Sequence, residues 1–75
     1  MINLSNSCLE IGDIILYPYS KRIFLITDLN IRDDTVGYIV IEENELIEQR
    51  RNRSIKNFIS NISASHSARL IKKKL

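Results

Sequence analysis

The side chains best suited to chemistry in this chain are cations, and they are concentrated toward its C-terminal end. Residues 50–75 carry eight basic side chains and no acid, a local charge of +8. Residues 1–49 hold all nine acids and three basic side chains, so their local charge is −6 and the net charge of +2 conceals the asymmetry. A cationic segment of this density attracts anions, of which phosphate backbones are the commonest target. The predicted anion-binding residues are Arg50, Arg51, Arg53, Lys56, Arg69, Lys72, Lys73 and Lys74.

These cations form two different kinds of cluster. The arginines of residues 50–53 with Lys56 form the denser one, and their guanidinium groups suit bidentate contacts with phosphate. Asn52, between them, can add a hydrogen bond to a base edge or a phosphate. The lysines of residues 72–74 are expected to project into solvent as a tail that adds a mobile, non-specific contact. The alternative is that the acids of residues 42–48 pair with residues 50–56, because exposed ion pairs are frequent and individually weak.

Three tyrosines are candidates for stacking on unpaired bases. Tyr17 and Tyr19 are two residues apart, so they would share one face of a strand, and Tyr38 lies on a predicted neighbouring strand. The alternative is that all three rings form part of the half-buried wall of a small sheet.

The chain has few residues of the types that catalysis and metal binding require. Covalent catalysis needs a nucleophile, a base and an orienting group that converge, yet Cys8 is the only cysteine and His66 the only histidine. These counts exclude a disulfide within the chain and a zinc cluster built from its Cys and His. The two glycines, Gly12 and Gly37, are too few for a glycine-rich phosphate loop. We therefore expect a protein that is not an enzyme and has no metal and no cofactor.

Length and composition predict one small domain over residues 1–75, with residues 1–10 loosely ordered and residues 72–75 as a basic tail. The single thiol fits a reducing compartment, which predicts a cytoplasmic protein. No apolar run approaches the ~20 residues that cross a bilayer, so no membrane partner is expected.

The first half of the chain has the signature of three strands. Ile14–Tyr17, Arg22–Thr27 and Val36–Ile41 are short, rich in β-branched and aromatic residues, and bounded by turn formers. Apolar residues on both alternating faces of the second and third runs predict central strands or strands covered on both sides. Pro18 lacks a donor and predicts that the first strand ends at a sheet edge, while Gly37 predicts a bulge.

The second half combines an ambiguous segment with a helix and a last strand. Residues 44–52 fit either a strand or a helix, and the propensities of Glu, Leu, Gln and Arg favour the helix locally. Ser54 is a plausible N-cap, and an apolar stripe follows it, which predicts a helix from Ile55 to Ile62 with Phe58 on the sheet. Leu70 and Ile71 supply a closing strand. The turn at Asp33 and Asp34 is expected to be stabilised by bonds from these side chains to their own backbone.

The stretch from Ile11 to Leu16, IGDIIL, resembles the Gly-Asp-hydrophobic opening of SH3-like small barrels. The resemblance covers residues 11–41 and, with the predicted element order, implies a mainly β fold with a short helix (α+β): an SH3-like small barrel, or a bent antiparallel sheet with one helix packed on it. The opening and the basic pair Lys21 and Arg22 are also similar to MazF-type endoribonuclease toxins. In that family a proline follows the basic residue, where this chain has Ile23, and the family's domain is longer. This second resemblance implies ribonuclease activity.

We therefore expect a small non-catalytic module whose basic C-terminal third contacts RNA or DNA, mainly through the phosphate backbone. The alternative is a protein-interaction module, such as a phage-type inhibitor or accessory factor, that docks on a larger protein machine. The sequence also leaves a homodimer open as a partner.

Overall fold

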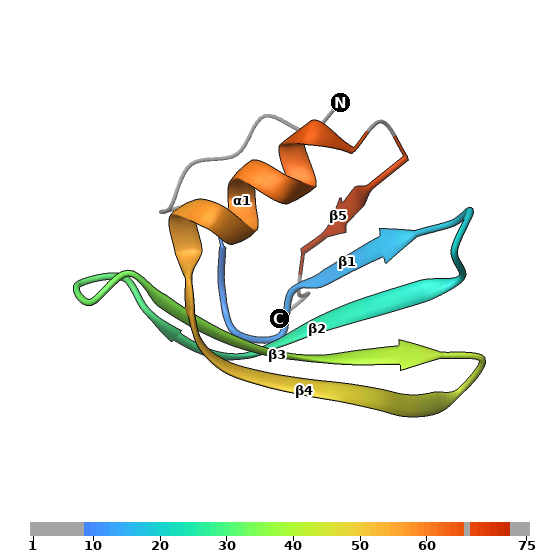
Figure 1. Cartoon of the computed structure of the whole chain (residues 1–75), viewed down its shortest axis with the longest axis horizontal. Helices are drawn as coiled ribbons and strands as arrows, with labels where there is room; N and C mark the ends of the chain where they lie inside the picture. Colours follow the sequence, from blue (N-terminus) through green and yellow to red (C-terminus); the bar gives the residue numbers. More distant parts are fainter. Residues whose placement is uncertain (1–8, 66, 73–75) are drawn as a thin grey trace.

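The computed structural model describes residues 9–65 and 67–72 of the chain. Five strands and one helix follow one another as β1 (Ile14–Tyr17), β2 (Arg22–Asn30), β3 (Thr35–Glu42), β4 (Glu45–Ser54), α1 (Ile55–Ala64) and β5 (Arg69–Ile71). The strands form one antiparallel sheet in the order β4-β3-β2-β1-β5. The sheet is bent, and α1 lies on one of its faces (Figure 1). The predicted bent antiparallel sheet with one packed helix is confirmed, whereas β4 and β5 are the outermost strands of the described sheet and no pairing between them closes a barrel.

The three strands predicted in the first half are confirmed. β1 pairs with β2 on one side and, from Ile14 to Leu16, with β5 on the other, so most of it is internal to the sheet. Its last residue, Tyr17, pairs only with Arg22 of β2, so the end of the strand beside Pro18 lies at an edge, as predicted.

The ambiguous segment is a strand. β4 pairs with β3 from Glu45, opposite Glu42, to Ser54, opposite Thr35. The two residues between these strands, Glu43 and Asn44, have φ angles of 51° and 67°, and two successive left-handed residues are typical of the tight turn that matches the twist of a hairpin. The hydrogen-bond ladder with β3 thus outweighs the local helix propensity of the segment.

Gly37 lies at an irregularity in both of its pairings, as the sequence predicted. The register shifts between Ile26 and Asp28 on one side and between Val36 and Tyr38 on the other. A Cβ at Gly37 would lie 2.8 Å from Oδ2 and 3.1 Å from Cβ of Asp28, and 3.3 Å from the carbonyl oxygen of Arg50, so a larger residue there would displace the Asp28 side chain and crowd the backbone of β4. Opposite the second shift, Asn52 has a φ of 57°, and the extra residue bends β4 shortly before α1 begins.

The core fills the space between α1 and the sheet. The predicted stripe of α1 is buried, with Phe58 and Ile62 packed in the same cluster as Ile15 and Ile26 of the sheet. Leu9, within the segment expected to be loosely ordered, is also buried in this cluster, whereas residues 1–8 lie outside the described part of the chain.

Two acidic loop residues hold the start of α1 and the turn that precedes β3. The predicted N-cap is confirmed, because the Asn57 N–H donates to Ser54 Oγ at 3.3 Å. Asp34 reaches the same helix end: its Oδ2 accepts from Ser54 Oγ at 2.8 Å and its Oδ1 from the Lys56 N–H at 3.2 Å. Asp33 holds the turn with Asn30, whose Oδ1 accepts from the Asp33 N–H at 3.1 Å. Asp34 therefore joins a distant helix to the turn.

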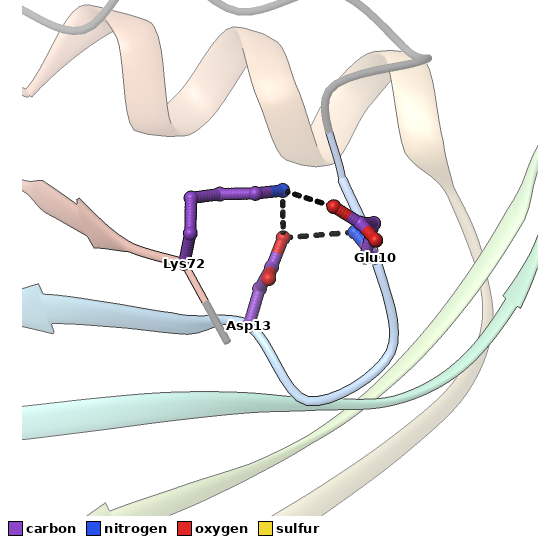
Figure 2. A network of polar contacts seen from close by, with 3 residues as sticks. All are labelled: Glu10, Asp13 and Lys72. Atoms are coloured by element: carbon purple, nitrogen blue, oxygen red, sulfur yellow. Dashed lines mark hydrogen bonds and ion pairs between the residues drawn. The ribbon is translucent and has the colours of Figure 1, made fainter. Parts of the chain in front are cut away.

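A buried carboxylate connects the loop before β1 with the residue that follows β5. Asp13, just before β1, is fully buried, and its Oδ2 accepts from Lys72 Nζ at 2.7 Å and from the Glu10 N–H at 2.8 Å (Figure 2). Lys72 also pairs with Glu10 Oε1 at 3.1 Å. The hydrogen bond to Asp13 raises the pKa of Lys72 above its ordinary value. Lys72, expected to be part of a solvent-exposed tail, is thus anchored to the loop before β1, because the buried carboxylate needs a cationic partner.

Replacing Phe58 by alanine should lower the free energy of unfolding by about 3 to 5 kcal/mol, because a buried ring is removed and a cavity remains. Urea denaturation followed by circular dichroism measures this change. Asn61→Ala, an exposed position of the same helix, is the control and should change stability by less than about 0.5 kcal/mol. Equal effects of the two substitutions would show that Phe58 is not a core residue.

Replacing Lys72 by methionine should cost about 1.5 to 3 kcal/mol, because Asp13 loses a charged hydrogen-bond partner. Since the pKa of Lys72 is raised, its contribution is complete at neutral pH and is lost only as the pH rises above its ordinary value of 10.5. Urea denaturation at several pH values measures the difference between the two proteins. Lys56→Met, at an exposed position of α1, should have little effect. A loss no larger than that of the Lys56 variant would contradict the anchoring role.

Candidate nucleic-acid interface

A row of aromatic rings runs from β1 across the sheet to the helix. The ring centroids of Tyr17 and Phe24 are 5.1 Å apart, those of Phe24 and Tyr38 are 5.4 Å apart, and those of Tyr38 and Phe58 are 4.8 Å apart. Burial, with the nearby Tyr38, raises the pKa of Tyr17, so its hydroxyl remains protonated at neutral pH. The row gives the sheet an aromatic surface beside α1.

The three tyrosines proposed for stacking are therefore not equivalent. Tyr17 and Tyr38 are half-buried in the row, which agrees with the alternative that these rings form part of the wall of a small sheet. Tyr19 lies in the turn after β1 and is 92% exposed. Because the strand ends at Tyr17, Tyr19 does not continue its face, and the expected pairing of these two rings is wrong.

A groove of about 540 Å³ lies where this aromatic surface meets β4 and α1. Phe24, Tyr38 and Phe58 supply its apolar lining. The polar lining comes from β4 and α1 and consists of Glu48, Arg50, Asn52, Arg53, Ser54, Asn57 and Asn61. The groove thus combines flat apolar rings with cationic and amide side chains, and we call it the aromatic groove.

The sheet register places the arginines at this groove. Arg50 lies opposite Tyr38 and therefore on the same face of the sheet, and Arg53 lies opposite the buried Val36. Arg50 forms an ion pair with Glu48, so part of its charge is balanced within the strand. Among the described residues no ion pair involves Arg53, and its guanidinium group is available to a ligand.

The N-terminus of α1 does not provide an anion site. Ser54 and Asp34 accept hydrogen bonds from its first free N–H groups, and the carboxylate of Asp34 places a negative charge there. A phosphate would meet this carboxylate, so phosphate contacts at this end of the molecule must come from arginine and lysine side chains.

The topology separates the eight predicted cations. Arg50 and Arg53 line the aromatic groove, Arg51 lines a neighbouring depression with Asn52, and Lys56 is exposed on the first turn of α1. Arg69 is exposed on β5, at the other edge of the sheet from β4 (Figure 1). Lys72 is paired with Asp13, and Lys73 and Lys74 lie outside the described residues.

Two asparagines of α1 belong to the groove but were not predicted as site residues. Asn57 and Asn61 are four residues apart, so they share the helix face beside Phe58. The four-residue spacing was visible in the sequence, but it indicates a site only because β4 lies next to that face of the helix. Their amide groups can donate to and accept from a base edge.

No group of three or more His, Cys, Asp or Glu side chains in the described part of the chain is placed to hold a metal ion. None of the described helices is long and apolar enough to span a membrane.

Comparison with known proteins adds no relative to this description. The chain matches no protein-family model, no curated protein and no solved structure.

Proposed function

We propose that this chain is a non-catalytic module that binds nucleic acid through the aromatic groove. One observation carries the proposal: three aromatic rings and the guanidinium groups of Arg50 and Arg53 line the same groove. Proteins that bind single strands use this combination, because rings stack on bases of any sequence while cations follow the phosphate backbone. A single strand is therefore the preferred form, and RNA and DNA share the chemistry that is recognised.

Phosphate contacts should supply most of the affinity. The basic end of β4 and the first turn of α1 contribute four cations, whereas the acids of the same hairpin lie toward its turn at Glu43, apart from Glu48, which lines the groove and pairs with Arg50. This separation directs the backbone of a ligand toward the α1 end of the groove. The asparagines that line the groove add hydrogen bonds to bases, which permits only a modest sequence preference.

The non-catalytic part of the proposal depends on composition. The chain has one cysteine and one histidine, and neither lies among the described residues. Arg22, the basic residue that the toxin resemblance singles out, forms an ion pair with Glu42 at 3.3 Å. RNA cleavage by the purified chain that disappears in Arg22→Ala would contradict this part of the proposal. The lone thiol remains the reason to expect a reducing, cytoplasmic setting.

The salt dependence of binding tests the phosphate contacts. If the two arginines of the groove and the adjacent Arg51 and Lys56 all contact phosphates, log affinity for a single strand should fall with log salt at a slope of roughly −2.8. Changing Arg50, Arg51 and Arg53 together to glutamine should flatten this slope by about two units. Fluorescence anisotropy with a labelled oligonucleotide measures both slopes.

Arg69→Gln is the matched control for this experiment, because Arg69 is an exposed arginine at the other edge of the sheet. It should leave the slope nearly unchanged. If this single change flattens the slope as much as one groove arginine does, attraction is diffuse and the groove is not the site. A chain that binds neither RNA nor DNA at low salt would refute the proposed function and favour a docking role for the basic end.

Stacking is tested by Tyr38→Leu. Loss of the ring should weaken single-strand binding by about 1 to 3 kcal/mol and leave duplex binding unchanged, because duplex bases are not free to stack. Tyr17→Leu is the control, since Tyr17 belongs to the aromatic row but does not line the groove. Equal losses for both variants, with folding verified by circular dichroism, would contradict a direct role for Tyr38.

A further inference from the structure

The face of the sheet away from α1 carries two rows of aliphatic side chains. Residues paired across antiparallel strands point to the same face, so the register defines each row. One row consists of Ile71, Ile14, Leu25 and Ile39, and the other of Leu16, Ile23, Ile41 and Leu46. At the irregularity beside Ile41, Ile47 is the extra residue of β4 and lies next to Leu46. We call this nine-residue surface the aliphatic face.

No described helix or strand covers the aliphatic face. α1 lies on the opposite face of the sheet (Figure 1). The six side chains from the three central strands are all partly exposed, and they are not among the residues packed on the core under α1. At the outer strands, Leu46 is 60%, Ile47 44% and Ile71 45% exposed.

This arrangement is unusual for a solvated sheet. An antiparallel sheet with one face in water normally carries polar side chains on that face, whereas here the rows meet polar groups only at their ends, at Gln49 and Arg69. The exposed parts of the nine side chains amount to on the order of 500 Å² of apolar surface, the size of the largest apolar patch on a typical monomer, which is often a functional one.

We infer that the aliphatic face binds the same face of a second copy of this chain. Its two rows contain no charge that would select a partner of complementary sign, and rows of isoleucine and leucine side chains are themselves a suitable surface for packing against other such rows. Two copies would bury roughly 1,000 Å², which is the lower limit for a specific interface, so association should be weak and dependent on concentration. The two sheets then form a sandwich about 10 Å thick around a two-fold axis.

The geometry leaves the other face of each sheet free. In such a dimer both α1 helices, and with them both aromatic grooves, point outward on opposite sides. The inference does not depend on what the grooves bind, and a dimer without nucleic-acid binding would leave it intact.

Sedimentation equilibrium on the full chain tests the inference from about 10 µM to 1 mM, the range in which a weak dimer dissociates. The unaltered chain should dimerise, and Leu46→Lys with Ile47→Lys should raise the dissociation constant at least tenfold, because two charges enter an apolar contact. Ile31→Lys is the control, since Ile31 is an equally exposed isoleucine in the turn between β2 and β3 and lies off this face. It should leave the dissociation constant unchanged.

A second measurement does not depend on substitutions. In a mixture of isotope-labelled and unlabelled chains, intermolecular NOEs should connect the methyl groups of Leu25 and Ile39 in different copies. Absence of a dimer at every concentration overturns the inference, as does a dimer that the paired lysines do not weaken. A monomer whose aliphatic face binds only phosphatidylcholine vesicles overturns it as well.

Discussion

One helix of ten residues has to cover a face of a five-stranded sheet, and this limit determines where the core, the groove and the open face lie. α1 packs nearest to β3 and β4, because it follows β4 directly after the bend at Asn52. The apolar stripe of α1 packs against core residues of the sheet such as Ile15 and Ile26. The aromatic row extends beyond this cover, so Phe24 and Tyr38 remain partly exposed at the groove, whereas Phe58 is buried. No second helix in the described chain is available for the other face of the sheet.

Polar contacts hold the start of the short helix and join the two chain segments next to β1 and β5. At its start, Asp34 satisfies N–H groups that would otherwise be unpaired and binds Ser54 at the same time. Beyond its end, Lys72 connects the residue after β5 to the buried carboxylate of Asp13. These hydrogen bonds require particular partners at particular positions, whereas hydrophobic packing does not. A small domain with a modest core depends on such contacts for a defined structure. The negative charge at the helix start also explains why the cations that can serve a ligand are side chains of β4.

Local sequence patterns were sufficient to predict those strands and the helix whose formation has one dominant cause. The three β-branched runs and the capped stripe of α1 were predicted with nearly correct bounds. β4 was ambiguous because its side chains favour a helix locally, and only its ladder with β3 makes it a strand. The cationic set was identified as a whole, but its division between two sheet edges depends on topology. Apolar residues on both faces of the second and third strands were visible too, although sequence alone did not indicate that no described helix or strand would cover one of these faces.

Binding at the aromatic groove is the central claim, and an NMR titration of the isotope-labelled chain with a single-stranded oligonucleotide at low salt tests it most directly. If the groove is the binding site, chemical shifts should change first at the backbone of residues 50–54 and at the side-chain amides of Asn52, Asn57 and Asn61. Signals of β5 and of the aliphatic face should remain in place. A spectrum that does not change, or one in which only the β5 end responds, would contradict it.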